Sequence, residues 1–378
     1  MKKLILAFVL ISAGIAGCDS GSTTETSSGS FDFSVSMDTV KIDAAEDLLF
    51  VGWNLASSGE SADGKYLYNF NRNEPISLEI ISLEELKLEK IIPMELEGPD
   101  GVGSAYMSKV LLTKEGNLIL SDGYQISAFD KQFRRVSSFR MDKDEFIVKS
   151  LPEGRRIWLD QAFSQDGKKL LAFYGGPNMD DPKEGVISID FESQTSKIIP
   201  IEWLSSWKKH QITQLYEGRP MNAVFSPSNL LVKGDSLIFS VGAENKVHFL
   251  NLKTDSISTK TYQSQFTPQR SSLNFPESVD SEEKFRELLK EKQKEVRYRN
   301  LLYDSKNKVY WRFTTEESSS KKSVLTVFSE DFEQLGELLL PEGFKVPSKT
   351  FVSNGTIYTY LNQDDEVYFV RLKPEFSN

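Results

Sequence analysis

Cysteine occurs once in this chain, as Cys18, so no disulfide can form within it. Histidine is almost as rare, with only His210 and His248 present. A histidine-rich metal site or a Ser-His-Asp triad therefore has little to draw on. The stability of the folded chain must come from core burial alone.

Positive charge is also in short supply, because 45 lysines and arginines face 55 aspartates and glutamates and give a net charge of −10. Removal of an N-terminal leader that contains Lys2 and Lys3 would take the charge to −12. Nucleic-acid binding depends on neutralising phosphates, so an acidic chain is not expected to bind nucleic acid. Docking on anionic lipid head groups is disfavoured for the same reason.

The strongest hydrophobic run lies at the N-terminus and is short. Lys2 and Lys3 precede the apolar residues 4–11, and the run is interrupted by Ser12 and Gly14. A membrane span needs about 20 apolar residues, whereas a signal peptide needs a basic start, a short apolar core and small residues at the cleavage site. Residues 1–17 are therefore predicted to be a signal peptide; an ordinary secretory signal and a membrane anchor are the alternatives.

The end of this segment, residues 15–18 (Ile-Ala-Gly-Cys), resembles the lipobox of bacterial lipoproteins. The resemblance implies that Cys18 is lipidated and becomes the first residue of the mature chain. Residues 19–30 have no side chain able to bury apolar area, so residues 18–30 are expected to form a flexible tether. The protein is thus expected in the bacterial cell envelope, attached by lipid to a membrane, with the outer membrane or a periplasmic face favoured.

A faint repeat runs through the remainder of the chain. Each copy has a polar turn, a short hydrophobic strand, a second turn and an alternating strand rich in Val, Ile, Tyr and Phe. The first turns of the copies lie near residues 63–65, 115–117, 166–169, 234–236, 306–308 and 354–356. A repeat built from several short strands is typical of a β-propeller, in which blades stack radially and leave only short edges.

The fold class predicted from this repeat is all-β: a six-bladed β-propeller of four-stranded antiparallel blades, forming one domain over residues 31–378. The alternating segment 31–42 precedes the first full copy. We expect it to pair as the outer strand of the last blade and so to close the ring. A seventh partial blade and two stacked sandwiches are the alternatives.

One helix is predicted at about residues 280–297. Asp280 and Glu283 resemble a capping box. Apolar positions then recur at helical spacing, together with one lysine: Phe285, Leu288, Leu289, Lys292 and Val296. This helix is either a lid or partner-binding helix on one face of the disc, or an insertion that packs its apolar stripe on the rim of a blade.

Two stretches resemble known propeller lipoproteins. Residues 97–103 and 116–122 (Glu-Gly-Pro-Asp-Gly-Val-Gly and Gly-Asn-Leu-Ile-Leu-Ser-Asp) resemble the inter-blade loop and strand of six-bladed propeller lipoproteins of Bacteroidota. Residues 163–170 are similar to the repeat of periplasmic TolB-type propellers, with Gln165 where proline is usual. With the lipobox, the chain resembles a Bacteroidota lipoprotein family catalogued as a domain of unknown function. The resemblance implies a six-bladed ring and no particular reaction.

Arginines that precede or begin strands are the first candidate binding residues. Arg156, Arg219 and Arg299 are singled out, with Arg155 and Arg297 beside them. In a propeller such positions can lie near the mouth of the central channel, where guanidinium groups can bind a carboxylate or phosphate bidentately. The alternative is ion pairing with neighbouring acidic residues.

Aromatic residues in one long segment are the second candidate. Trp203, Trp207 and Tyr216 can stack on a sugar or a peptide, or can cover the core. His210 lies in the same segment, whereas His248 alternates within a strand and is expected to be structural.

No metal or cofactor is expected. The acidic turns at residues 178–184 and 364–366 offer oxygen ligands of the kind that Ca²⁺ takes. Neither turn has the spacing of a known calcium loop, so both are interpreted as solvated hairpin turns.

Three functions stay open, because no catalytic motif is found. The favoured one is a membrane-anchored module that binds or scaffolds a protein or peptide. The second is binding or sensing of a glycan or anionic ligand by the arginines and by Trp203 and Trp207. The third is a calcium-dependent propeller hydrolase or a lyase, so that enzymatic activity is uncertain and not favoured.

Overall fold

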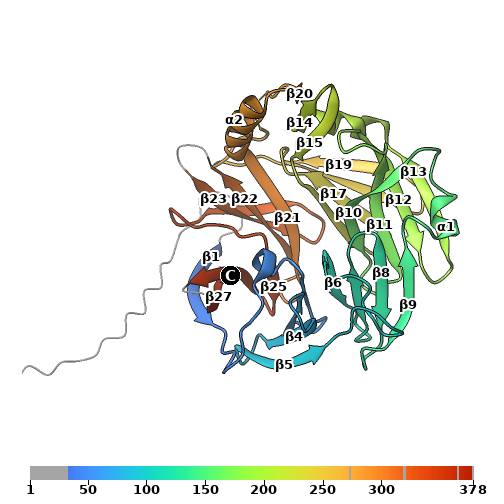
Figure 1. Cartoon of the computed structure of the whole chain (residues 1–378). Coiled ribbons are helices and arrows are strands. Elements are labelled where there is room, and N and C mark those ends of the chain that lie inside the picture. The colour runs from blue at the N-terminus through green and yellow to red at the C-terminus, as the bar shows by residue number, and fades with distance from the viewer. Residues whose placement is uncertain (1–32, 272–273, 318–320, 364–365, 377–378) are drawn as a thin grey trace, which may run out of the picture.

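The computed structural model describes residues 33–271, 274–317, 321–363 and 366–376. Over these residues the chain is mostly β, and six four-stranded antiparallel sheets form the blades of a β-propeller (Figure 1). The predicted fold class is confirmed. Cys18, the signal peptide and the tether lie outside the described residues.

The blades are numbered 1 to 6 from β2 onwards, and each is built from the inside outwards. The inner strands are β2 (Ser58–Glu60), β6 (Lys109–Leu112), β10 (Arg156–Phe163), β16 (Ser228–Lys233), β21 (Val296–Asp304) and β25 (Thr350–Ser353). The second strands are β3 (Tyr66–Asn71), β7 (Leu118–Ser121), β11 (Lys169–Gly175), β17 (Ser236–Val241), β22 (Val309–Glu316) and β26 (Thr356–Gln363). The third strands are β4 (Ser77–Ser82), β8 (Gln125–Phe129), β12 (Lys183–Asp190), β18 (Lys246–Asn251), β23 (Lys322–Ser329) and β27 (Glu366–Phe376). The outer strands are β5 (Lys87–Pro93), β9 (Arg135–Arg140), β13 (Thr195–Pro200), β19 (Ile257–Thr261), β24 (Gln334–Leu339) and β1 (Phe33–Lys41).

The turn between the inner and second strands is the element that the sequence repeat marks. In blade 3, Ser164 Oγ donates to Asp166 Oδ1 at 2.6 Å, and the following Gly167 has a φ of 70°. Blade 1 repeats this arrangement with Ser61, Asp63 and Gly64. A positive φ strains any residue with a side chain, so glycine fits there. All six predicted turns fall between the first two strands of a blade.

The ring is closed by the N-terminal strand, as the sequence predicts. β1 pairs antiparallel with β27 along all nine of its residues, from Phe33 opposite Phe376 to Lys41 opposite Tyr368. Blade 6 is therefore built from both ends of the described chain, with β1 as its outer strand. We refer to β1 in this position as the latch.

The latch contributes to the core as well as to the sheet. Phe33 and Val35 are 2% and 0% exposed and belong to the core shared by blades 5 and 6. The Phe33 ring meets the Trp311 ring edge-on, with 5.3 Å between centroids. Removing these side chains from water contributes about 2 kcal/mol each to stability.

Ion pairs stabilise the solvent-facing side of the latch. Asp38 accepts two hydrogen bonds from the Arg371 guanidinium, at 2.8 and 2.6 Å, and one from Lys373 at 2.8 Å. These hydrogen bonds, that of Arg371 first, lower the pKa of Asp38 to about 2. The carboxylate therefore stays charged at all physiological pH values.

Two insertions depart from the regular blades, and both join an outer strand to the next inner strand. The first contains the 3-10 helix η2 (Glu202–His210), β14 (Gln211–Tyr216) and β15 (Arg219–Phe225). The second contains β20 (Ser278–Val279) and α2 (Glu282–Gln293). β20 pairs parallel with β14, so the insertions share a small three-stranded sheet. A shorter helix, α1 (Glu145–Val148), precedes blade 3, and the 3-10 helix η1 (Gly52–Leu55) precedes blade 1.

The predicted helix at 280–297 is present but shorter. It ends at Gln293, because Val296 already begins the inner strand β21. Its N-cap is Ser281, whose side chain accepts from the backbone N–H of Lys284 at 3.3 Å, and not Asp280. The helix packs on β14 and β20 of the small sheet, not on the rim of a blade.

A buried ion pair fixes α2 to the first insertion. Lys292 is 4% exposed, and its Nζ donates to Glu295 Oε2 at 2.9 Å and to the carbonyl oxygen of His210 at 2.9 Å. Glu295 also accepts from Ser271 Oγ at 2.7 Å. Desolvation lowers the pKa of Lys292, and the charge of Glu295 opposes that shift. The two insertions therefore form one packed unit.

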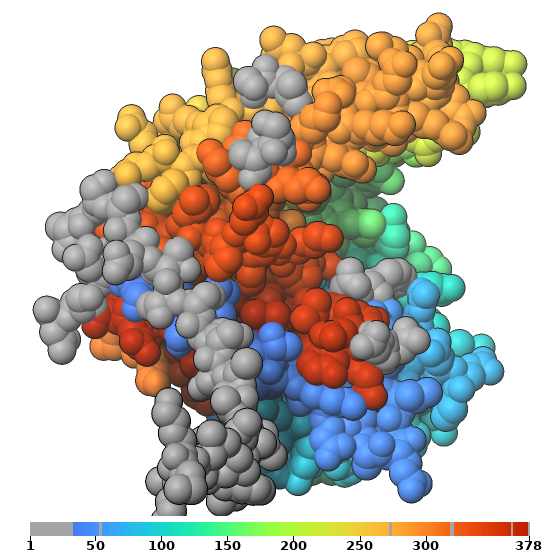
Figure 2. Space-filling model, turned by 90° about the vertical axis from the view of Figure 1, so that its left-hand side faces the viewer, coloured from blue at the N-terminus to red at the C-terminus, as the bar shows by residue number. Residues whose placement is uncertain are grey.

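This unit overhangs the disc. In Figure 2 the second insertion, in orange, projects above the blue and cyan residues of the first blades. A hollow separates the two, and residues of the middle of the chain, in green, are visible at its floor.

Candidate functional site

The chain enters every blade at the same face of the disc. Each inner strand begins there, and α1, the small sheet and α2 lie in the connections that lead to inner strands. We call this the insertion face. Residues at the starts of inner strands are thereby gathered around one end of the central channel, which we call the channel mouth.

Two lysines at the channel mouth connect neighbouring blades. Lys183 Nζ lies 3.1 Å from Asp160 Oδ2 and donates to Ser228 Oγ at 2.7 Å, which joins blades 3 and 4. Lys349 Nζ lies 2.7 Å from Glu60 Oε1, and this pair joins blades 6 and 1. Both lysine side chains are 13% exposed. These four charges neutralise one another in pairs.

Lys109 is the cation at the mouth that has no partner. It is the first residue of β6, its side chain is reached by solvent, and it makes no hydrogen bond or ion pair with any described residue. The pKa of Lys109 is lowered, chiefly because the surrounding protein desolvates the ammonium and further because of Lys349, while Asp160 acts in the opposite direction. An unpaired ammonium beside other cations is a position at which a bound anion is favoured.

The neighbouring strand β2 passes very close to β6. A side chain at Gly59 would place its Cβ 2.1 Å from the carbonyl oxygen of Val110, so only glycine allows this approach. The inner strands of blades 1 and 2 thus meet backbone to backbone, and this contact fixes the strand that carries Lys109.

Arg156, predicted as a binding residue, also lies on the insertion face. It begins β10, and its guanidinium carbon lies 5.1 Å from the centroid of the Trp158 ring. Its Nε is buried without a hydrogen-bond partner. Arg155, by contrast, is paired with Glu184 at 2.7 Å.

The other two predicted arginines lie elsewhere. Arg299 is half-buried in β21 and donates to the carbonyl oxygen of Val346 at 3.2 Å; burial lowers its pKa, and the charge of Arg297 lowers it further. Arg219 is exposed at the first residue of β15, beside the tip of the β14–β15 hairpin. The structure therefore does not bring Arg156, Arg219 and Arg299 into a single cluster.

The predicted aromatic residues lie in and around a packed cluster. Trp207 is 8% exposed and belongs to the core that blades 3 and 4 share. Trp203 is 39% exposed, and its ring lies 4.5 Å from the His248 ring and 6.2 Å from the Phe239 ring, centroid to centroid. Both tryptophans occur in η2, and Tyr216 ends β14, so the expected long loop is in fact a helix followed by a strand. Trp207 has little surface left for a ligand.

His248 is enclosed by this cluster, and its Nδ1 lies 2.8 Å from Thr259 Oγ1. Desolvation lowers the pKa of His248 to about 4 from an ordinary value of 6.5. The folded state thus resists protonation that the unfolded state accepts, so stability should fall as pH falls from about 6.5 towards 4.

We expect urea denaturation at pH 5 to show about 2 kcal/mol less stability from this residue than at pH 8. The variant His248→Gln should lose that part of the pH dependence. An unchanged pH profile in His248→Gln would show that other groups cause it.

His210, unlike His248, contacts a carboxylate. Its Nε2 lies 3.1 Å from Glu244 Oε1, and Lys209 Nζ lies 2.6 Å from the same oxygen. The pKa of Glu244 is lowered, chiefly by the hydrogen bond with His210 and then by that with Lys209, with Lys246 adding to the shift. This cluster ties η2 to the connection between β17 and β18.

In the described part of the two acidic turns, Asp181, Glu184 and Glu366 are paired or hydrogen-bonded within the protein. Asp181 accepts from the backbone N–H of Asn178 at 2.7 Å, and Glu184 is paired with Arg155. Glu366 is paired with Lys41, whereas residues 364–365 lie outside the described part of the chain. No group of three or more potential metal ligands occurs among the described residues.

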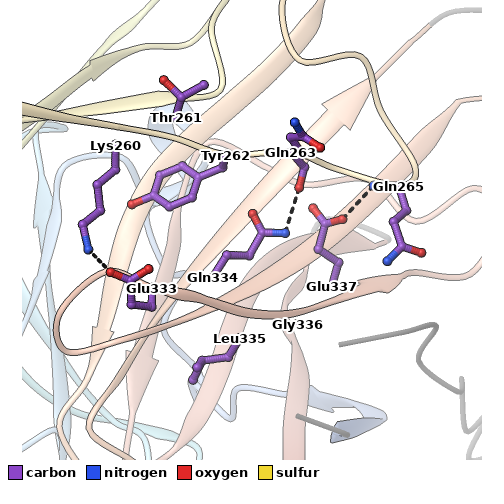
Figure 3. A pocket seen from close by; sticks show the side chains of 10 residues that line it. All are labelled: Lys260, Thr261, Tyr262, Gln263, Gln265, Glu333, Gln334, Leu335, Gly336 and Glu337. Atoms are coloured by element: carbon purple, nitrogen blue, oxygen red, sulfur yellow. Dashed lines mark hydrogen bonds and ion pairs between the residues drawn. The ribbon is translucent and has the colours of Figure 1, made fainter. Parts of the chain in front are cut away.

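A cavity of about 570 Å³ lies far from the mouth, at the rim between the outer strands β19 and β24 (Figure 3). Its charged groups already have partners: Lys260 pairs with Glu333, and Glu337 accepts from the backbone N–H of Gln265 at 3.0 Å. Gln334 Nε2 crosses to the carbonyl oxygen of Gln263 at 2.8 Å. Despite its size, the cavity offers less for recognition than the channel mouth.

The three mouth lysines, Lys109, Lys183 and Lys349, were not among the residues predicted from the sequence. The signal that was available is position, because Lys109 begins β6 and Lys349 immediately precedes β25. Both stand a few residues before the turn glycine of their repeat, Gly116 and Gly355. A lysine in a sequence ordinarily indicates solvated surface, so the recurrence of lysine at the starts of inner strands was not recognised as a binding site.

Comparisons with known proteins agree with the fold. A family model described as "Domain of unknown function (DUF4221)" matches residues 30–339, a range that runs from just before β1 to the end of β24. A crystal structure of a member of that family from Bacteroides vulgatus has a TM-score of 0.66 and 15% identity, and covers 91% of this chain and 99% of its own.

A protein from Bacteroides fragilis, described in its structure as a "putative exported protein", has a TM-score of 0.48 and 9% identity over 91% of this chain and 96% of its own. No curated protein matches this chain by sequence.

Proposed function

Because the chain belongs to the DUF4221 family, which brings a fold and no stated activity, we propose a function from the site itself. We propose that the protein is an envelope-anchored binding module that holds an acidic segment of a partner protein at the channel mouth. The observation that carries this proposal is Lys109, an ammonium at the channel mouth of an acidic protein that has no hydrogen-bond or ion-pair partner among the described residues.

Charge at the mouth supports an anionic ligand. Three lysines and two carboxylates surround the opening, and each of the two carboxylates is paired with a lysine other than Lys109. A ligand carboxylate at the channel mouth would therefore lie near the positive charge of Lys109, which is not paired with any carboxylate of the described residues.

Apolar surface on the same face supports a peptide over a simple ion. Leu159, in the inner strand β10, is 56% exposed, and Tyr124 and Val148 nearby are 45% and 42% exposed. On the overhanging hairpin, Met221 is 53% and Phe225 is 40% exposed. Exposed apolar groups beside unbalanced charge are typical of protein interaction sites.

The proposal is tested with fluorescein-labelled decapeptide libraries that are acidic, neutral or basic and otherwise matched in composition. We expect members of the acidic library to bind, and their affinity to fall as salt rises from 20 to about 200 mM, because salt screens the charges. Binding of basic peptides equal to that of acidic ones, or no response to salt, would contradict the proposal.

The anchor is a separate part of the proposal. No helix among the described residues is long and apolar enough to cross a bilayer. We propose that the thiol of Cys18 is acylated and that residues 18–30 tether the propeller to the membrane. The variant Cys18→Ser should move the protein from the membrane fraction to the soluble fraction, and mass spectrometry of the wild-type N-terminus should find fatty acid on Cys18.

A further inference from the structure

A second, smaller cavity lies on the insertion face between blades 2 and 3. Its volume is about 190 Å³, and its walls are largely apolar, formed by Tyr124, Met141, Val148 and Leu151. Met141 is 3% exposed, and its backbone N–H donates to the carbonyl oxygen of Tyr124 at 2.8 Å, which holds these two walls together. Val148 is the last residue of α1.

The helix that carries Val148 is fixed to the blade beneath it. Ile147, its neighbour in α1, is fully buried. Ser196 Oγ, in the outer strand β13, donates to the carbonyl oxygen of Phe146. The wall of the cavity is therefore built on a fixed element.

Arg156 is the one charged group lining this cavity that has no charged partner. Its guanidinium makes no hydrogen bond or ion pair with any described residue, and its Nε is buried. The two other charged residues that line the cavity are occupied, because Arg155 is paired with Glu184 at 2.7 Å and Asp142 with Arg140 at 2.9 Å.

The orientation of Arg156 is set by an aromatic ring. The guanidinium lies over Trp158 at 5.1 Å from the ring centroid, a cation–π contact that holds the planar group in place. A planar guanidinium held in this way presents paired N–H donors that match a carboxylate, which ammonium groups do not. Apolar walls with one oriented charged group are typical of sites for small amphipathic ligands.

We propose that this cavity binds a small apolar molecule with a single carboxylate. The carboxylate pairs with Arg156, and the hydrocarbon part lies against Tyr124, Met141, Val148 and Leu151. This site goes beyond the proposed function: it shares Tyr124 and Val148 with the apolar surface beside the channel mouth, but its charged group is Arg156 and not Lys109.

Hexanoate, 1-hexanol and hexylamine are suitable probes, because they have the same chain and differ in the charge of the head group. Titration of the full mature chain, followed by tryptophan fluorescence and by calorimetry, should show binding of hexanoate at least about tenfold tighter than of 1-hexanol. Hexylamine should not bind. The fluorescence change should vanish in Trp158→Phe while the calorimetric signal persists.

The neighbouring arginine provides a matched control. Arg156→Met should weaken hexanoate binding at least about tenfold, and Arg156→Lys should recover only part of it, because lysine lacks the paired donors. Arg155→Met should leave hexanoate affinity within about twofold. Circular dichroism checks that each variant folds.

Equal binding of hexanoate and 1-hexanol, or equal effects of Arg156→Met and Arg155→Met, would overturn the proposal. Binding of the acidic peptides is expected to survive Arg156→Met, so failure of one proposal is distinguishable from failure of the other.

Discussion

Replacing Lys109 with glutamate is expected to reduce the affinity for acidic peptides about a hundredfold, equivalent to about 3 kcal/mol. The substitution removes the unpaired ammonium of the channel mouth and places a carboxylate beside Asp160, whose charge now favours the lysine cation. Attraction between the channel mouth and an acidic peptide is thereby replaced by repulsion.

Lys114 supplies the matched control for this variant. It is exposed in the turn at the opposite end of β6, so Lys114→Glu makes the same change in net charge at the other face of blade 2. Lys109→Met, which removes charge without reversing it, should cost about tenfold in affinity. If Lys109→Glu and Lys114→Glu weaken binding equally, net charge and not the channel mouth governs the interaction.

Replacing Val35 with aspartate is expected to unfold the protein or open the ring. Val35 is fully buried in the core between blades 5 and 6, so the new carboxylate would be desolvated without a cation to pair with. Such a burial costs about 4 kcal/mol or more, a large part of the 5–15 kcal/mol that stabilises a typical domain. The loss should appear as a lower urea midpoint followed by circular dichroism.

Thr39→Asp is the control for the latch, because Thr39 is exposed on the same strand. We expect it to change the free energy of unfolding by no more than about 0.5 kcal/mol. If Val35→Asp unfolds at the same urea concentration as Thr39→Asp, β1 does not hold the ring closed.

The fold could be predicted because its signals are local. The turns around Asp63 and Asp166 contain serine, aspartate and glycine in fixed order, and the structure uses each side chain or φ as that order implies. The latch could be inferred because blade 6 supplies only three strands before the chain ends, which leaves an edge for residues 33–41.

The small sheet could not be predicted, because its pairing is long-range and brief. β20 has two residues and joins β14 through only Thr213 with Ser278 and Gln214 with Val279, so residues 278–279 show no strand pattern of their own. The end of α2 was misplaced for a related reason. Val296 fits the apolar stripe of the helix, but it is taken by β21, where it pairs with Glu316.

Of the residues that form the two candidate sites, Arg156 could be singled out from the sequence and Lys109 could not. Arg156 follows from its position at the start of a strand, and the structure leaves it without a charged partner. No local sequence pattern identifies Lys109 as a binding residue. Its electrostatic environment depends on Lys349 and Asp160, which are distant in the sequence and lie near it only in the folded ring.

The most direct test of the account changes the ligand and leaves the protein intact. The tightest acidic decapeptide and its copy with every Asp and Glu replaced by Asn and Gln are titrated into the full mature chain by calorimetry at low salt. We predict that the neutral copy binds at least about thirtyfold more weakly than the acidic peptide. In Lys109→Met the difference in affinity between the two peptides should be smaller. Equal affinity of the two peptides would contradict recognition of an anion at the channel mouth.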